Sequence, residues 1–304
     1  MKREIHNVGE SVRARLTNET RRTQTDFQLI VRRYFFERFL ARLSASEARN
    51  RFILKGAMLF QVWSDNPYRA TTDLDLLRRG PTGLDSIRRD VVAVLTTKIE
   101  DDGVAFDSER IEFAEIRAGD DSPGIRCHFE ATLTSIRDML QIHLGTADVV
   151  SPQPETIAYP TLLDHPRPLI LAYTAESVVA EKLDAMVVLG ITNSRIKDFV
   201  DLHYLAANFG FDGQSVADAV RKTFRRRATP IPEREPVALT EEFWTTTGRE
   251  TQVRAFARRA RLDMSLQDLQ HFLPLLRSFL LPVLDVIRGD GEFDRTWLPG
   301  GPWQ

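Results

Sequence analysis

Two carboxylates alternate with leucines in the short stretch "RATTDLDLLRRG", residues 69–80. In an extended strand alternate side chains face the same side, roughly 6.5 to 7 Å apart. Asp73 and Asp75 would therefore project together, while Leu74 and Leu76 point into the core. Such a pair can bind Mg²⁺, which prefers a few carboxylates together with substrate phosphates and water. The alternative is a solvent-exposed strand edge on which this spacing arose by accident.

A glycine upstream of this strand favours the metal interpretation. Gly56 in "LKGAM" lies where a short apolar strand is expected to turn into a helix. A residue without a side chain lets phosphate oxygens approach the N–H groups that are exposed at a helix start. A phosphate-binding turn followed by a strand with two carboxylates is an arrangement suited to nucleotide chemistry.

A lysine stands on the apolar face of a helix expected in "ESVVAEKLDAMVVLG". On a helical wheel Lys182 falls between Val178 and Met186, opposite Glu181 and Asp184. Burying an unpaired ammonium costs several kcal/mol. Lys182 must therefore reach solvent along its stem, form an internal ion pair, or contact an anion such as a triphosphate or the strand carboxylates.

Acidic side chains recur on the next expected helix, "NSRIKDFVDLHYL", residues 193–205. Lys197, Asp198 and Asp201 share one flank, and Lys197 with Asp201 could form an ordinary surface ion pair worth a few tenths of a kcal/mol. His203 lies on the apolar face, which is more typical of a core histidine than of a catalytic one.

Composition excludes several classes of protein. The 304 residues carry a formal net charge of −2, so no overall field draws the molecule to nucleic acid or membrane. The single cysteine, Cys127, rules out an internal disulfide framework and multi-cysteine metal sites, and we expect it in a buried strand. No apolar run approaches the roughly 18 residues of a membrane span, so we expect a cytoplasmic protein.

The expected elements change character near residue 150. Before it, we predict one long helix over 8–44, strands and helices up to residue 100, and three strands between 104 and 150. The proline-rich stretch 151–168 marks the expected domain boundary. Beyond it we predict helices over 175–190, 194–208, 214–228, 240–261 and 265–288, and a poorly ordered tail after residue 297.

Three segments together resemble a known family: "FILKGAMLFQVWSDNPYRATTDLDLL", "AESVVAEKLDAMV" and "NSRIKDFVDLHYL". They are similar to the AbiEii/AbiGii toxin family of nucleotidyltransferases, which includes the MenT-type toxins of toxin–antitoxin systems. The resemblance runs from about residue 50 to residue 210. It implies an α+β fold in which residues 1–150 form N-terminal helices and a nucleotidyltransferase domain with a DNA polymerase β-like mixed sheet. Residues 151–304 would form an all-helical C-terminal domain.

The same resemblance assigns roles to residues. Gly56 and Ala57 stand at the family's phosphate-binding turn, Asp73 and Asp75 at its metal-binding acidic pair, and Lys182 at its motif lysine. The candidate catalytic residues are thus Asp73, Asp75, Lys182, Asp201 and Asp198. The candidate nucleotide-binding residues are Lys55, Gly56, Ala57, Arg69, Thr71 and Thr72, and the candidate metal ligands are Asp73 and Asp75.

The implied activity is nucleotide transfer from a nucleoside triphosphate, with a pyrimidine expected, supported by Mg²⁺. The expected acceptor is the 3′ end of tRNA, whose modification blocks aminoacylation and translation, and a cognate antitoxin would neutralise the toxin. The Arg-rich segments 221–227 and 249–261 could contact the tRNA acceptor stem, although such runs are often solvated faces.

Two positions depart from the family pattern. Ala57 replaces the usual Ser or Gly and removes a hydroxyl contact to phosphate. His143 occupies the position at which related enzymes carry a third carboxylate, and we expect a passive strand residue there rather than a ligand of metal or phosphate. An enzyme of the same fold that modifies a protein hydroxyl or a small molecule, or a nucleotide-binding module that has lost catalysis, therefore remains an alternative.

Overall fold

The computed structural model describes residues 7–64, 71–116, 124–146 and 148–304, so Arg69 lies outside the described residues. The chain divides into two compact units. The first comprises Met1–Ala147 and Glu155–Ala172, and the second comprises Asp148–Pro154 and Tyr173–Gln304. The expected single boundary at residue 150 therefore differs from the observed division. One short strand within the proline-rich stretch (Glu155–Ala158) and another directly after it (Leu169–Ala172) complete the sheet of the first unit, which returns the chain to that unit after residue 154.

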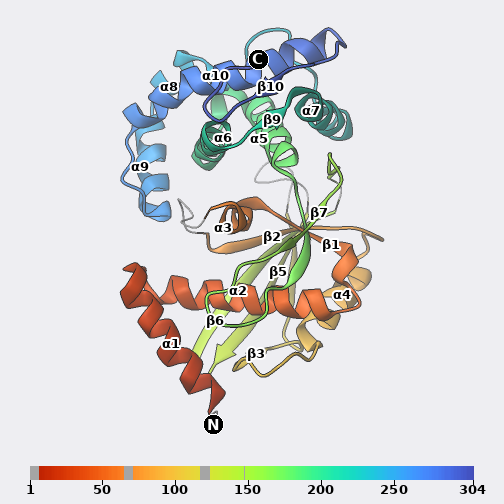
Figure 1. Ribbon diagram of the computed structural model, residues 1–304, viewed down its shortest axis with the longest axis vertical. Coiled ribbons are helices and arrows are strands. Elements are labelled where there is room, and N and C mark those ends of the chain that lie inside the picture. The colour runs from red at the N-terminus through yellow and green to blue at the C-terminus, as the bar shows by residue number, and fades with distance from the viewer. Residues whose placement is uncertain (1–6, 65–70, 117–123, 147) are drawn as a thin grey trace. The chain divides into compact units, whose positions relative to one another are not determined.

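A mixed sheet forms the centre of the first unit (Figure 1). Within the described residues it has eight strands in the order β3-β5-β6-β2-β1-β8-β7, with β4 paired to β5. The strands are β1 (Phe52–Lys55), β2 (Asp73–Arg78), β3 (Val104–Phe106), β4 (Glu112–Ile116), β5 (Gly124–Leu133), β6 (Ile136–Gly145), β7 (Glu155–Ala158) and β8 (Leu169–Ala172). The expected α+β fold is confirmed by this sheet and by the helices of both units.

The acidic strand β2 lies inside the sheet rather than at its edge. It pairs antiparallel with β1 and parallel with β6. Leu74 and Leu76 are fully buried, as the alternating pattern predicts. At the far end of β2, Arg78 is buried and its Nε donates to Asp90 of α4 (Leu84–Thr96) at 2.9 Å. This buried ion pair fixes the strand that carries the two carboxylates.

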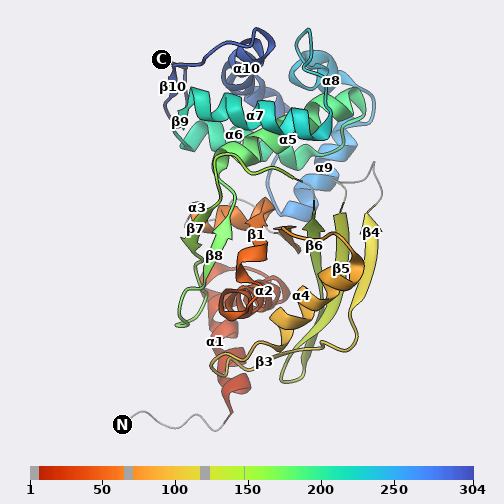
Figure 2. The ribbon, with the colours of Figure 1, turned by 90° about the vertical axis from the view of Figure 1, so that its right-hand side faces the viewer.

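Two helices precede the sheet, where the sequence predicts one. Helix α1 (Val8–Thr23) ends at Gln24, which has a left-handed φ of 54°, and α2 (Phe27–Ala45) begins after Asp26. The Asp26 carboxylate accepts a hydrogen bond from the N–H of Gln28 at 2.8 Å and so caps α2. The prediction of an unbroken helix over 8–44 was wrong because a capping aspartate can start a new helix without any Pro or Gly. Figure 2 views α2 nearly end-on, with β8 on one side of it and β6 on the other.

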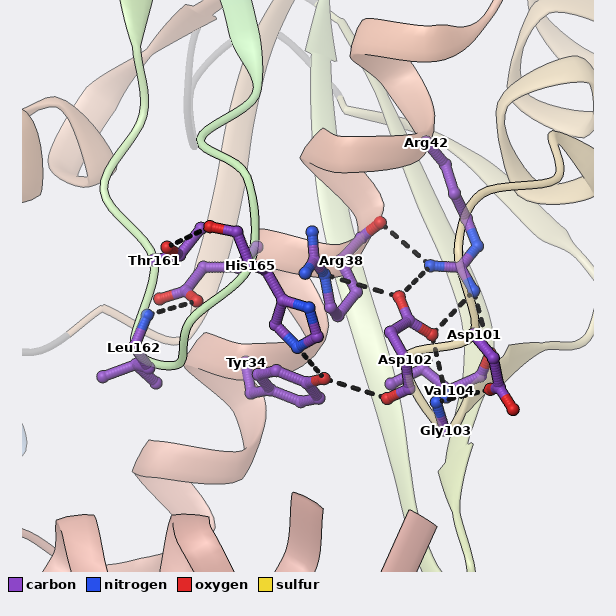
Figure 3. A network of polar contacts seen from close by, with 11 residues as sticks. Tyr34, Arg38, Arg42, Asp101, Asp102, Gly103, Val104, Thr161, Leu162 and His165 are labelled. Atoms are coloured by element: carbon purple, nitrogen blue, oxygen red, sulfur yellow. Dashed lines mark hydrogen bonds and ion pairs between the residues drawn. The ribbon is translucent and has the colours of Figure 1, made fainter. Parts of the chain in front are cut away.

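A buried polar network holds α2 to two loops of the same unit (Figure 3). Arg42 makes two bonds to the Asp102 carboxylate, at 2.8 and 3.1 Å, and Arg38 lies 3.4 Å from the same group. The Tyr34 hydroxyl donates to the Asp102 carbonyl at 2.9 Å and also contacts His165 at 3.0 Å. Removing one partner of such a buried pair typically costs 3–5 kcal/mol. The network therefore fixes the loops before β3 and between β7 and β8.

The second unit is built mainly of helices. Within the described residues these are α5 (Ala175–Leu189), α6 (Ile196–Asn208), α7 (Gly213–Arg227), α8 (Glu241–Thr245), α9 (Arg249–Ala260) and α10 (Leu266–Arg288). The helix expected over 240–261 is divided into α8 and α9 by Thr246–Gly248, where Gly248 adopts a φ of 85°. Gly allows this conformation at little steric cost.

One described helix, α10, is long and apolar enough to cross a membrane by length and composition alone. The sequence had led us to expect no such segment. Leu269, Leu276 and Leu280 of α10 are fully buried, and the helix packs against α6 and α7. Its apolar face is therefore accounted for by packing within the second unit.

The C-terminal tail is packed, contrary to the expectation of a poorly ordered end. Strand β10 (Thr296–Trp297) pairs with β9 (Phe211–Asp212). Trp297 is fully buried, and its indole N–H donates to the carbonyl of Ala206 at 2.8 Å. Trp303 donates to the carbonyl of Phe279 at 2.9 Å. The expectation rested on the position of these residues at the chain end and overlooked the large apolar area of Trp303.

Burial makes the stability of the first unit depend on pH through Glu37. Its carboxylate is fully buried and accepts the N–H of Leu162 at 2.8 Å, and burial raises the pKa of Glu37 to about 7. The folded state then holds a proton that the unfolded chain releases near pH 4.5. Stability from this group is complete below about pH 4 and declines by roughly 3 kcal/mol as pH rises through 7.

Denaturant unfolding of wild type and Glu37→Gln between pH 4 and 8 tests this dependence. As pH rises, the unfolding free energy of wild type should fall relative to that of Glu37→Gln. Glu47→Gln, at an exposed acid beyond the end of α2, is the matched control and should leave the pH profile unchanged. Parallel profiles for wild type and Glu37→Gln would contradict the expectation.

Candidate active site

The two carboxylates of β2 face the same side of the sheet. Asp73 and Asp75 are partly buried, and they alternate with the buried side chains of Leu74 and Leu76. The side chain of Asp75 keeps 29% of its surface exposed. The interpretation of a core strand with one acidic face is therefore confirmed, and the position of β2 between two other strands excludes an exposed sheet edge.

Gly56 is required by its contact with Asp75. It has a φ of 72°, and a Cβ built on it would lie 2.1 Å from Oδ2 of Asp75. No side chain fits there without moving the carboxylate. The turn that follows is a 3₁₀ segment, η2 (Gly56–Leu59), and a single α-helical turn, α3 (Phe60–Trp63). The expected helix is thus too short for a large helix dipole, and any phosphate contact here would come from local backbone N–H groups.

The other candidate nucleotide-binding residues have different surroundings. Lys55 ends β1 and is paired in register with Asp75, and Ala57 lies within η2. The Thr71 hydroxyl donates to the carbonyl of Asp73 at 3.1 Å, so it shapes the start of β2. Thr72 is exposed. The structure therefore places Lys55, Ala57 and Thr71 beside the acidic pair.

Strand β6 supplies partners that the sequence analysis missed or undervalued. Its parallel register puts Gln141 opposite Asp73 and His143 opposite Asp75. Gln141 Nε2 donates to Asp73 Oδ1 at 3.0 Å, and His143 Nδ1 lies 3.1 Å from Asp75 Oδ1. The expectation that His143 is passive does not agree with this contact. The alternation of Gln141 and His143 along the sequence could have indicated that both side chains lie on one face of a strand. Only the register between β2 and β6 shows that this face is the one that carries Asp73 and Asp75.

The residues beside Gly56 fit a magnesium ion that arrives with a nucleotide. Among the described residues no group of three or more His, Cys, Asp or Glu side chains is arranged to hold a metal. Mg²⁺ is usually held by one or two carboxylates together with substrate phosphates and water. Asp73 and Asp75 provide two carboxylates. Because Gly56 has no Cβ, the backbone of the turn can lie directly against the Asp75 carboxylate.

In the second unit Lys182 is engaged in an internal ion-pair cluster. Its ammonium donates to Asp198 Oδ1 at 2.8 Å and to Asp201 Oδ2 at 2.5 Å. Both aspartates are fully buried, and 11% of the Lys182 side chain is exposed. Of the three possibilities for Lys182 left open by the sequence, the structure shows the internal ion pair. It also overturns the interpretation of Asp201 as part of an exposed surface pair.

A second cation completes this cluster. The Arg195 Nε donates to Asp198 Oδ2 at 2.6 Å, and the sequence analysis did not single out this residue. Burial alone would raise the pKa of Asp198, but the charges of Lys182, Arg195 and nearby Lys197 lower it to about 2. Asp198 therefore stays ionised when folded, which is the state that holds Lys182 in place.

His203 is a packing residue, as expected. Its ring stacks on Phe272 of α10 with 3.7 Å between ring centroids and 12° between planes. Burial lowers the pKa of His203, so the neutral ring is favoured.

The first Arg-rich segment, 221–227 on α7, divides into buried and exposed cations. Arg227 forms ion pairs with Asp148 at 2.8 Å and with Asp184 at 2.9 Å, so its charge is used within the second unit. Arg225 and Arg226 are exposed. Together with Val149 and Lys222 they line an open groove of about 380 Å³.

The second Arg-rich segment, 249–261 on α9, divides in the same way. Arg249 is buried, with its guanidinium 3.6 Å from the centroid of the Phe243 ring. Arg254, Arg258, Arg259 and Arg261 are exposed. Exposed cations are thus available on both segments, though fewer than the sequence suggests.

Substituting Gly56 should disturb the acidic pair. Gly56→Ala introduces a Cβ against Asp75 and a strained left-handed residue, which costs about 1–3 kcal/mol. We expect a lower melting temperature and at least tenfold weaker Mn²⁺ binding in titration calorimetry. Gly83→Ala is the control because Gly83 has an ordinary φ of −63° and open space around it. Wild-type Mn²⁺ affinity in Gly56→Ala would show that the close contact is not needed.

Removing the Lys182 charge should destabilise the second unit. Lys182→Met leaves two buried carboxylates short of their shared cation, and we expect a loss of about 3–5 kcal/mol in denaturant unfolding at pH 7. Because the Asp198 pKa is lowered, the stability it contributes is present above about pH 4 and is lost as pH falls towards 2. Lys197→Met is the matched control and should cost less than 1 kcal/mol. Equal losses from both variants would refute a central role for Lys182.

Comparisons with solved structures and curated proteins add remote similarities. A crystal structure from H. pylori, of a protein provisionally assigned as a nucleotidyltransferase, aligns with 88% of this chain and 100% of its own at 14% identity and a TM-score of 0.49. The structure of JHP933 from Helicobacter pylori aligns with 86% of this chain and 94% of its own at 15% identity and a TM-score of 0.48. No significant match is found among curated proteins.

The family comparison covers most of the chain. The model of the nucleotidyl transferase AbiEii toxin of type IV toxin–antitoxin systems matches residues 38–282, which include β1, β2, β6 and helices α5 and α6. The chain therefore belongs to the AbiEii family of nucleotidyltransferase toxins.

Proposed function

We propose that this toxin transfers a nucleotide, a pyrimidine by preference, from a nucleoside triphosphate to the 3′ acceptor end of tRNA. The observation that carries the nucleotide chemistry is the contact of the Gly56 turn with the Asp73 and Asp75 strand. The added nucleotide would prevent aminoacylation and so stop translation. A cognate antitoxin would neutralise the enzyme, and both would act in the cytoplasm.

The acidic pair fits the binding of the triphosphate. Asp73 and Asp75 would hold Mg²⁺, which neutralises phosphate charge and polarises the reacting phosphoryl group. The side-chain-free turn at Gly56 admits phosphate oxygens to local N–H groups. In the transfer, the acceptor 3′ oxygen forms a bond to the α-phosphorus, the bond between that phosphorus and the bridging oxygen breaks, and pyrophosphate leaves. The hydroxyl proton passes to water.

Lys182, Asp198 and Asp201 enter the proposal through the family motif. Lys182 would neutralise charge on the phosphates or on the leaving pyrophosphate. Asp198 and Asp201 orient its ammonium through bonds of 2.8 and 2.5 Å. Such catalysis consists of positioning and electrostatic stabilisation.

The tRNA part of the proposal is supported by charge. The exposed cations Lys222, Arg225 and Arg226 around one groove can bind phosphates of an RNA backbone. The exposed arginines of α9 add a second cationic surface. On a chain with a net charge of −2, these local clusters are the feature that favours a polyanionic acceptor.

The test is incubation of the protein with each labelled triphosphate, Mg²⁺ and total RNA, with label scored on tRNA, on protein or on neither. We expect label at the tRNA 3′ end. Asp73→Asn should reduce transfer about 100-fold or more, since even indirect partners of a metal usually cost 10–100-fold. Asp85→Asn, at an exposed acid in the first turn of α4, is the control and should retain activity.

The acceptor is tested separately with Arg225→Gln/Arg226→Gln. We expect weaker tRNA binding and a shallower salt dependence, by about one unit of log–log slope for each phosphate that the protein no longer neutralises. Arg234→Gln/Arg295→Gln removes two exposed charges elsewhere in the second unit and should change neither. Label on protein would instead support an enzyme that modifies protein hydroxyls. Absence of label from every acceptor, with nucleotide still bound, would support a module that has lost catalysis.

A further inference from the structure

Strands β2, β6 and β5 align two polar columns across the sheet. In one column the registers place Asp75, His143 and Arg126 side by side, and in the other they place Asp73, Gln141 and His128. Alternate residues of the same strands, such as Leu74 and Ile142, are buried on the opposite face. Each carboxylate therefore has a partner on β6, and each β6 partner has another on β5.

The hydrogen-bond partners decide which nitrogen of His143 carries its proton. Arg126 Nε lies 3.3 Å from His143 Nε2. A guanidinium has donors and no acceptor, so Nε2 must accept and Nδ1 must carry the hydrogen. Nδ1 is the atom 3.1 Å from Asp75 Oδ1. His143 thus donates to the carboxylate, and its Nε2 lone pair faces Arg126.

Gln141 follows the same logic. Its amide nitrogen lies 3.0 Å from Asp73 Oδ1 and 2.7 Å from His143 Nε2, both of which are acceptors. One amide hydrogen binds the carboxylate, and the other shares the single Nε2 lone pair of His143 with Arg126, the amide contact being the shorter of the two. The amide oxygen then accepts from His128 Nε2 at 2.7 Å. The reversed amide would place its oxygen against the carboxylate, so one orientation satisfies all three contacts.

We infer that His143 and Gln141 are positioning residues that donate hydrogen bonds to the metal-binding carboxylates, and that His143 is not itself a metal ligand. A metal-binding histidine must offer a ring lone pair. Here Nδ1 carries the hydrogen that faces Asp75, and the Nε2 lone pair already faces the donors of Arg126 and Gln141, so neither nitrogen is open to a metal ion. The strand position of the missing third carboxylate is therefore filled by a donor that fixes one oxygen of Asp75. The inference rests on the proposed function for the identity of the ion, but the hydrogen bonds are independent of it.

Two amide substitutions separate the roles of the ring nitrogens. His143→Asn places an amide near the position of Nδ1 and can keep the donor to Asp75, whereas His143→Gln places it near the position of Nε2. We expect the Mn²⁺ dissociation constant of His143→Asn to stay within about threefold of wild type. His143→Gln should weaken Mn²⁺ binding 10–100-fold, as is common for groups that orient metal ligands. Met139→Ala, at an exposed site on the same face of β6, is the matched control.

The opposite pattern would overturn the inference, because tight binding in His143→Gln with weak binding in His143→Asn would identify Nε2 as a ligand. Wild-type affinity in both variants would show that the hydrogen bond from His143 does not position Asp75. Equal weakening in both would show that only the size and shape of the His143 side chain matter, which would also overturn the inference. Circular dichroism and melting temperatures establish that each variant is folded before its affinity is interpreted.

The ring spectrum of the wild-type protein gives a test that needs neither metal nor turnover. With the six histidines labelled with ¹⁵N, the His143 ring should show a protonated Nδ1 and an unprotonated Nε2, identified by the signal missing in His143→Gln. A protonated Nε2 with an unprotonated Nδ1 would overturn the inference. Protein that shows the expected ring and the expected Mn²⁺ pattern but transfers no nucleotide would retain this inference and refute the proposed function.

Discussion

The register between β2 and β6 is the constraint on which the candidate site depends. Because the side-chain period of a strand is two residues, a slip of one residue would turn Gln141 and His143 to the core face. It would leave Asp73 and Asp75 opposite the apolar residues Leu140 and Ile142. The observed register instead buries those residues behind the sheet. A single backbone alignment therefore satisfies the core and the polar face together.

The carboxylates of the two units differ in their burial and in the groups that compensate their charge. In the first, Asp73 and Asp75 are partly exposed and receive hydrogen bonds from β6, an arrangement that keeps carboxylate oxygens near solvent. In the second, Asp198 and Asp201 are fully buried and are compensated by Lys182 and Arg195. Buried ions are costly unless paired. The motif residues of the second unit therefore stabilise its fold, in addition to the chemistry that the family motif assigns to them.

Local patterns predicted the elements better than their ends. The alternation in β2 and the apolar face of α5 were enough to identify both, since each has the period of its own secondary structure. The break between α1 and α2 was missed because it depends on the cap that Asp26 makes and not on a helix-breaking residue. The packed tail was missed because the burial of Trp303 depends on its contact with Phe279, which is distant in the sequence.

The sequence by itself determined the family, the alternating acidic pair and the need for a partner at Lys182, because these follow from residue types at fixed spacing. Only the tertiary structure decided that Lys182 pairs with Asp198 and Asp201, that Gly56 contacts Asp75, and that His143 and Gln141 donate to the acidic strand. Each of these contacts joins residues 16 to 68 positions apart, or lies at a turn whose backbone is set by its neighbours. Periodicity reports which face a residue occupies, whereas strand register and helix packing decide what it meets there.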